Sequence, residues 1–380
     1  MGTWFNMLLE GIGLPVNALT RFTVKLLFIT VVTKLILLCK TFWPSKKTEE
    51  TILQPGRDSA LDVAKAVLII LMIIGHFSVG KQFRAIVYSF HMVAFVFFRG
   101  YCFRPETCRD LSRTILKDIK RFLVPYALFG IGYILLTHDR NLVEIKRLIY
   151  GISFTKKLFV DVASIGPVYF ILLLFVTKII YLFVERYAPD EKWKALSVLG
   201  LSLLGMHIGK RGYWLPWSAD CAMYMLIFYY LGHCIKKYRI MEYICKRNYY
   251  YFILSSIWAY MIYEGSMEIA IRNYGTYGVV VLGSVSATIL LYMVCKYICQ
   301  TWNRHLASLA CLVGQNTLYI LITHKLLARN IAKVVSSVFT NGSVFYSGAM
   351  VLMQLAVGVL LGKLIMQIQK YLIKPAVHKI

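Results

Sequence analysis

The sequence predicts an all-α polytopic membrane protein, with about ten transmembrane helices around a central cavity and an additional interfacial helix at the N-terminus. Two observations predict this class. Of the 380 residues, 58% are hydrophobic and 16% are charged, whereas soluble domains are about 45–50% apolar and about 25% charged. The apolar residues also gather in runs that approach the roughly 20 residues needed for one crossing. Secreted enzymes, cytosolic enzymes and disordered scaffolds are therefore excluded.

The charge balance is strongly basic, since 43 Lys and Arg stand against 18 Asp and Glu, for a net charge of +25. In a soluble protein this excess would suggest nucleic acid as the partner. Here the basic residues lie in short segments between apolar runs, where they are retained on the cytoplasmic side beside anionic lipid. We therefore expect the bilayer, and no nucleic acid, as the partner of these charges.

The first 56 residues form a unit of their own, an amphipathic interfacial helix followed by a polar linker. Lys25 and Lys34 interrupt the apolar stretch 21–40, and no small-residue cleavage site follows it, so a cleavable signal is disfavoured. An interfacial helix is favoured over one extra crossing. The linker before the next apolar run contains two prolines, a pair of adjacent lysines and a pair of adjacent glutamates.

A membrane domain spanning residues 57–370 follows, with a short tail, 371–380, behind it. Within this domain the apolar runs cover residues 60–77, 86–103, 122–137, 167–184, 195–206, 217–231, 249–263, 277–299, 309–323 and 344–365. The basic segments 104–121 and 236–247 and the basic tail place both termini on the cytoplasmic side.

The first run carries the clearest candidate site. Asp62 and Lys65 are three positions apart and can pair on one helix face. His76 follows Lys65 by eleven positions, about 16 Å along a helix and close to three whole turns, so both line one stripe. An ionisable residue in hydrocarbon costs at least about 2.5 kcal/mol and is a functional candidate by default. A snorkelling lysine beside a packed histidine is the structural alternative.

Further candidates lie in three other runs. His91 and Arg99 share one aromatic run and one helix face. Arg121 begins the third run at a basic edge, and the ninth run contains Asn316 and ends at His324. We expect Arg99 to face the cavity within reach of His91, because no carboxylate lies in its own helix; snorkelling to the headgroups is the alternative.

Several chemistries are disfavoured by what the sequence lacks. It contains no phosphate loop, no HExxH and no GxSxG motif, and the histidines lack metal-ligand spacing, so we expect no metal site. Few carboxylates fall inside apolar runs, which disfavours proton pumps and paired-carboxylate glycosidases. What is left is a cavity with a basic edge and intramembrane histidines. A neutral histidine can deprotonate an alcohol that attacks an activated acyl carbon, and cations at the mouth can hold phosphates.

These segments together resemble the integral-membrane acyltransferase 3 family, in particular its fucose 4-O-acetylase-like branch of sugar O-acetyltransferases. The resemblance covers about four-fifths of the chain, from Arg57 to the last helix. The matching segments are Lys65 through His76, Phe90-His91-Met92 with Gly100-Tyr101, Lys120-Arg121 through Pro125-Tyr126, Gly166 through Phe170, Leu215 through Ser218 with Gly232-His233, and Gly314 through His324. Three positions depart from the family pattern: Lys65 replaces arginine, Val93 replaces proline, and Arg99 replaces a small residue.

The resemblance implies a multi-pass protein of the plasma (inner) membrane that transfers an acetyl or larger acyl group. The donor would be cytoplasmic acetyl-CoA, used as a co-substrate with no bound cofactor, and the acceptor a sugar hydroxyl of a lipid-linked or surface glycan. His76, or else His91, would be the general base. Lys65 and Arg121 would hold the donor phosphates, with Asp62 positioning Lys65.

Arg99, His324 and Asn316 would line the cavity on the acceptor side. Two other classes compete with this interpretation. A transporter or flippase for a glycan or an anionic solute could use the same basic cavity, although the sequence shows no internal repeat. A membrane scaffold is disfavoured by the intramembrane histidines and arginine.

Overall fold

The computed structural model describes residues 57–77, 80–136, 148–151, 168–264, 267–340 and 343–373. In these ranges the chain is helical and has no strand, apart from one isolated bridge between Glu268 and Asn273. The predicted all-α class is confirmed for this part of the protein. The predicted interfacial helix and the end of the tail lie outside the described residues.

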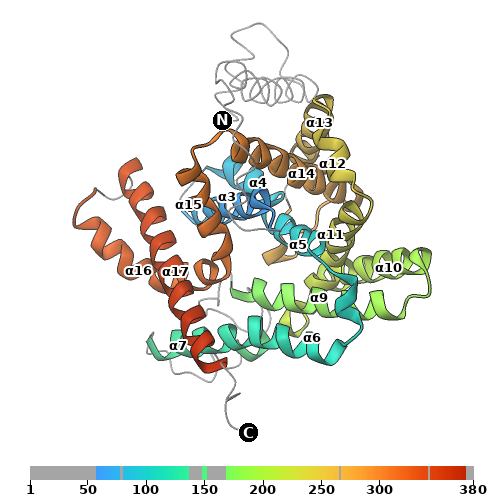
Figure 1. Ribbon diagram of the computed structural model, residues 1–380, viewed down its shortest axis with the longest axis horizontal. Helices are drawn as coiled ribbons and strands as arrows, with labels where there is room; N and C mark the ends of the chain where they lie inside the picture. Colours follow the sequence, from blue (N-terminus) through green and yellow to red (C-terminus); the bar gives the residue numbers. More distant parts are fainter. Residues whose placement is uncertain are drawn as a thin grey trace, which may run out of the picture.

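The helices follow the predicted apolar runs and add several short segments between them (Figure 1). Their bounds are α3 Ser59–Gly75, α4 Lys81–Tyr88, α5 His91–Tyr101, η1 Pro105–Cys108, α6 Leu111–Asp118, the π-helical η2 Ile119–Leu123, α7 Val124–Leu136, α9 Tyr169–Tyr187, α10 Glu191–Lys210, η4 Pro216–Ser218, α11 Ala219–Lys237, α12 Ile240–Cys245, α13 Tyr249–Glu264, η5 Ile269–Ile271, α14 Tyr277–Thr301, α15 Arg304–Gln315, α16 Thr317–Ser336 and α17 Val344–Ile373.

Three helical stretches of the described chain are long and apolar enough to cross a membrane, namely Gln82–Tyr101, Tyr277–Thr301 and Phe345–Gln367. A fourth candidate is a broken span, Arg304–Gln315 with Thr317–His324, whose halves are bent by 65°. These helices agree with a membrane protein. The full set of about ten crossings stays a prediction, because the other helices do not combine the required length and apolar composition.

Glycines set the closest helix packing around α3 and α5. A Cβ added at Gly314 of α15 would lie 1.8 Å from the carbonyl oxygen of Asp62 in α3. A Cβ at Gly100 of α5 would lie 1.9 Å from the carbonyl oxygen of Tyr229 in α11. Only glycine allows backbones to approach so closely. These contacts fix α3 between α15 and the α5–α11 pair, where the charged and histidine side chains described below are found.

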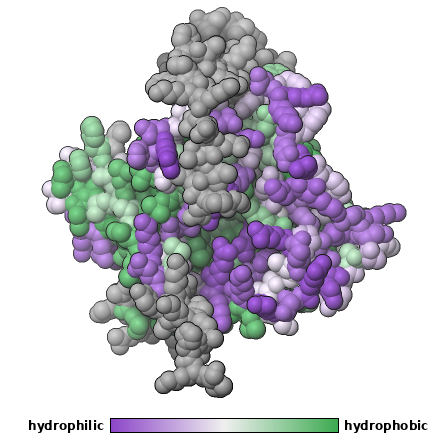
Figure 2. Space-filling view, in the orientation of Figure 1, coloured by the Kyte–Doolittle hydropathy of each residue, from purple (hydrophilic) through white to green (hydrophobic). Residues whose placement is uncertain are grey.

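The α16–α17 pair forms one side of the molecule, and α10 lies on the opposite side (Figure 1). Figure 2 shows apolar residues gathered over α16 and α17, whereas hydrophilic residues dominate the side near α10. Phe345, Leu352 and Leu360 of α17 are respectively 75%, 69% and 66% exposed. Exposed apolar side chains at this density are suited to lipid.

Candidate functional site

The first cluster lies at the start of α3, where the helix begins for a local reason. Asp58 is the N-cap, and its carboxylate accepts hydrogen bonds from the backbone N–H groups of Ala60 and Leu61. Its other oxygen accepts a hydrogen bond from the Tyr292 hydroxyl of α14 at 2.9 Å. Asp58 therefore both caps α3 and anchors its first turn to α14.

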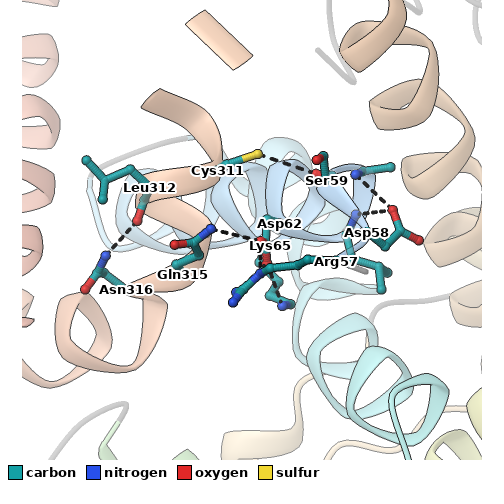
Figure 3. Close-up of polar contacts among 12 residues, drawn as sticks. Arg57, Asp58, Ser59, Asp62, Lys65, Cys311, Leu312, Gln315 and Asn316 are labelled. Carbon is teal, nitrogen blue, oxygen red and sulfur yellow. Dashed lines mark hydrogen bonds and ion pairs between the residues drawn. The ribbon is translucent and has the colours of Figure 1, made fainter. Parts of the chain in front are cut away.

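Asp62, one turn further, is the centre of this cluster (Figure 3). The residue is 2% exposed. Its carboxylate accepts hydrogen bonds from Arg57 Nε at 2.5 Å, from Lys65 Nζ at 3.0 Å and from Gln315 Nε2 at 3.3 Å. The predicted pairing of Asp62 with Lys65 is thus confirmed. Two cations share the carboxylate of Asp62, and Lys65 stays 25% exposed at the side chain.

A second cluster joins α5, α6 and α9 around Asp118, the last residue of α6. Asp118 is 4% exposed. Its Oδ1 accepts a hydrogen bond from Arg99 at 3.3 Å, and its Oδ2 pairs with the ammonium group of Lys178. Arg121 lies within electrostatic range of both Arg99 and Asp118, and also of Arg57. Arg99 and Arg121 also lie by the same ring, because their guanidinium carbons are 4.8 Å and 5.8 Å from the centroid of Phe122.

The structure corrects the expected surroundings of Arg99. Arg99 occupies the last turn of α5, whereas His91 is its first residue, about 12 Å away along the helix axis. The two side chains are not brought together. Arg99 instead pairs with Asp118, and its guanidinium lies 4.8 Å from the ring centroid of Phe122. A buried arginine needs a counter-charge, and because α5 contains no carboxylate, α6 supplies it.

His91 is positioned by a break between α4 and α5. Ser89, fully buried at this break, accepts a hydrogen bond from Trp258 Nε1 at 2.9 Å, and its carbonyl accepts one from the Ser284 hydroxyl at 2.6 Å. His91 Nδ1 lies 2.8 Å from the carbonyl oxygen of Val87. Because a carbonyl can only accept, Nδ1 carries the proton, and Nε2 of the neutral ring is the basic nitrogen.

His76 and His324 meet at the same end of the bundle. His76 is the exposed C-cap of α3, and its ring stacks on that of the buried His324 with centroids 5.4 Å apart. His324 Nδ1 lies 2.8 Å from the carbonyl oxygen of Leu321, so Nε2 is again the basic nitrogen of the neutral ring. Tyr88 links His91 to this end, because its ring centroid lies 5.1 Å from that of His91 and its hydroxyl donates to the carbonyl of Gly75, next to His76. Three of the predicted histidines, from α3, α5 and α16, thus share one region.

Asn316 belongs to neither group of charged or histidine side chains. It stands at the bend between α15 and α16 and is 1% exposed. Its Nδ2 donates a hydrogen bond to the carbonyl of Leu312 at 2.8 Å. Its Oδ1 packs against Gly362 of α17, so that a Cβ added to this glycine would lie 2.5 Å from the oxygen. Asn316 therefore shapes the broken span, and no contact in the described part of the chain places it beside the histidines.

Three residues of the two clusters were missed by sequence reasoning: Asp118, Lys178 and Gln315. Lys178 had a detectable signal, because a lysine inside the apolar run 167–184 is itself a functional candidate. Asp118 had none, since it lies in a polar segment and only the fold buries it. In the described residues, no three His, Cys, Asp or Glu side chains are arranged to hold a metal ion.

The fold and these clusters define a helical membrane protein with a cationic end and a histidine-bearing end. Comparison with known families then identifies its class, since a model of the acyltransferase 3 family, described as an acyltransferase domain, matches residues 58–365. This match spans most of the chain and includes both ends of α3, so the protein belongs to the acyltransferase 3 family and is a membrane acyltransferase. No curated protein and no solved structure matches the chain significantly.

Proposed function

We propose that this protein is an O-acetyltransferase of the plasma membrane, with both termini in the cytoplasm. It would move an acetyl group from cytoplasmic acetyl-CoA to a sugar hydroxyl of a cell-surface or lipid-linked glycan. One observation carries the proposal: α3 connects a cluster of phosphate-binding residue types near Lys65 to a histidine pair at His76. Family membership supports acyl transfer, and these two clusters supply the groups that such a transfer needs.

The reaction is a single displacement at the thioester carbon. Neutral His76 takes the proton of the sugar hydroxyl while the hydroxyl oxygen bonds to the acetyl carbonyl carbon. The carbon–sulfur bond then breaks, and coenzyme A leaves as a thiolate that recovers a proton from the histidine. His76 is preferred as the base because its side chain is exposed to substrates, whereas His91 is buried. His91 is the second candidate for the same role.

The donor would be held at the basic end. Lys65 and Arg121 provide cations that suit phosphate oxygens, and Asp62 fixes the position of Lys65 through its carboxylate. About 16 Å separate Lys65 from His76 along α3. The pantetheine arm of acetyl-CoA would extend across this interval, so that the thioester meets the acceptor hydroxyl beside His76. His324, stacked on His76, would line the acceptor side.

The decisive experiment measures acetyl transfer by the purified protein in lipid nanodiscs. Radiolabelled acetyl-CoA and a glycan fraction from the host are supplied, and label in the glycan is counted. Surface glycans from cells with and without the gene are compared by mass spectrometry. We expect loss of one acetyl mass in the cells that lack the gene. Intact donor and an unchanged glycan mass would overturn the proposal.

A transporter or flippase remains the second candidate, and one observation favours it. The broken span formed by α15 and the start of α16, bent by 65°, is a feature common in transporters. The same nanodisc assay separates the two classes, because a transporter does not consume acetyl-CoA. Movement of a labelled glycan across proteoliposomes without donor consumption would favour transport.

A further inference from the structure

The Asp118 cluster contains more positive charge than its carboxylate can balance. Both oxygens of Asp118 are already engaged, one by Arg99 and one by Lys178. Among the described residues, no second carboxylate pairs with either cation. Arg121 adds a third positive charge within electrostatic range. The cluster therefore carries one negative charge and up to three positive charges.

Two of these positive charges, on Arg99 and Lys178, are held well inside the protein surface. The side chains of Arg99 and Lys178 are 21% and 12% exposed, against 44% for Arg57 at the neighbouring Asp62 cluster. Burying a cation without a full counter-charge costs several kcal/mol. An anion that enters the cluster would remove this cost, so the excess charge is an arrangement suited to an anionic ligand.

The π-helical segment η2 gives the cluster its geometry. It spans Ile119–Leu123 and follows Asp118 directly. It turns Phe122 inward, where the ring is buried beneath the Arg99 guanidinium, and leaves Arg121 exposed. A guanidinium has five N–H donors, and Arg99 gives one of them to Asp118. Stacking on Phe122 holds the remaining donors in a fixed plane that suits phosphate oxygens.

We propose that Arg99 and Lys178 bind the diphosphate of the coenzyme A donor. The inference rests on the proposed function and assigns a site that function left open. The diphosphate is the phosphate group next to the pantetheine arm, so it enters further than the ribose 3′-phosphate. Lys178, whose side chain is 12% exposed, takes the diphosphate together with Arg99, which pairs with the same carboxylate. Arg121, which is exposed, takes the 3′-phosphate together with Lys65.

The test measures equilibrium binding of three probes to the protein in phosphatidylcholine nanodiscs. The probes are coenzyme A, 3′-dephospho-coenzyme A and pantetheine. Arg99→Gln and Lys178→Gln should each raise the Kd at least tenfold for the first two probes and leave pantetheine binding unchanged. Lys237→Gln, which removes a cation of the separate Glu191 ion pair, is the matched control and should leave all three values unchanged. Unchanged coenzyme A binding in folded Arg99→Gln would overturn the proposal.

A variant that is expected to strengthen coenzyme A binding, and not to weaken it, separates ligand binding from structural support. Asp118→Asn removes the negative charge but keeps the shape, so folded protein should bind coenzyme A several-fold more tightly. If the cluster only holds α5, α6 and α9 together, the same variant weakens binding. Should Asp118→Asn fail to fold, Arg99→Lys decides. It keeps the charge and the ion pair with Asp118 but loses the planar set of donors, so weaker coenzyme A binding by the folded variant supports the proposal, whereas unchanged binding contradicts it.

Lipid headgroups also carry phosphate groups that could bind these cations. A second set of binding measurements therefore varies the lipid composition of the nanodiscs. Adding phosphatidylglycerol to the nanodiscs should leave coenzyme A binding unchanged. If this lipid competes with coenzyme A in the wild type and loses that effect in Arg99→Gln, the site belongs to lipid and the proposal is wrong. Wild-type protein that binds coenzyme A through Arg99 but transfers no acetyl group would overturn the proposed function alone.

Discussion

The rings of His76 and His324 stack with centroids 5.4 Å apart and planes inclined by 23°. His76 ends α3 and His324 lies on α16, so 248 positions of sequence separate two side chains that share one face-to-face contact. The buried ring fixes the orientation of the exposed one. Because His324 Nδ1 bonds to a backbone carbonyl, its own position is set by α16, and it acts as a rigid support for His76.

Replacing His76 by alanine should abolish acetyl transfer while the protein still accumulates in the membrane. A general base contributes about 10²–10⁴-fold to the rate, so kcat should fall by at least a hundredfold. Initial rates at saturating acetyl-CoA measure the change. His305→Ala, an exposed histidine at the start of α15, is the control and should stay near wild type. A His76→Ala rate above about one tenth of wild type would contradict the assignment of the base.

Truncating His324 should have a smaller effect, because this residue positions His76. We expect His324→Ala to lower kcat about tenfold and to leave the KM for acetyl-CoA unchanged. His324→Phe keeps an aromatic ring for stacking and should recover most of the rate. If both variants lose activity as fully as His76→Ala, His324 takes a direct part in proton transfer and its role as a support is wrong.

Lys65→Ala should weaken the binding of acetyl-CoA and leave the rate of the acetyl transfer step nearly unchanged. A hydrogen bond to a charged group contributes about 1.5–3 kcal/mol, so the KM for acetyl-CoA should rise at least tenfold while kcat changes by less than threefold. Steady-state kinetics over a range of acetyl-CoA concentrations give both values. An unchanged KM would show that the phosphates bind elsewhere.

Gly314→Ala should destabilise the packing of α15 on α3. The added methyl group would lie 1.8 Å from the carbonyl oxygen of Asp62, where no flexible side chain can move aside. Overpacking of this kind costs about 1–3 kcal/mol, and thermal unfolding in nanodiscs should show a lower Tm. Gly200→Ala is the matched control, because nothing lies within 4 Å of its added Cβ. Equal Tm values for the two variants would contradict this packing.

Glu191 supplies a prediction on pH. Hydrogen bonds from Lys194 and Lys237 lower the pKa of this exposed carboxyl to about 2. Its ordinary value in the unfolded chain is higher, so the ion pairs stabilise the fold above about pH 4.3 and lose this effect as the pH falls towards 2. Exposed pairs contribute about 0.2–1 kcal/mol. The Tm difference between wild type and Glu191→Gln should therefore be small at pH 7, shrink below about pH 4.3 and vanish only below pH 2; a difference that grows on acidification would contradict it.

Much of the fold could be predicted, since apolar runs set where helices form. The apolar run 309–323 predicts one straight crossing, yet the chain bends by 65° within it. Asn316 causes this difference, because its amide bonds back to the carbonyl of Leu312 and competes with regular helix geometry. A hydropathy pattern does not register such a local hydrogen bond.

For the candidate site, helix periodicity found the one-turn pair of Asp62 and Lys65, but it was wrong for His91 and Arg99, two turns apart, and it missed the pairs between elements. Asp62 and Lys65 were paired correctly because both lie on α3. The helix of Arg99 contains no carboxylate, and its partner Asp118 comes from a segment that sequence alone assigns to a polar loop. Charge pairing between helices depends on which faces the fold brings together, and a single sequence gives no information on that.

The glycines of α17 have a consequence for how the protein is made. Cβ atoms at Gly358 and Gly362 would lie 2.6 Å from Ile320 Cγ1 and 2.5 Å from Asn316 Oδ1, so α17 fits directly against the bent region of α16. During synthesis α17 leaves the ribosome after every other helix described. Until it docks, the surface of α16 around Ile320 and Asn316 has no α17 packed against it. Translation must therefore pass Gly362 before the bend between α15 and α16 can be covered.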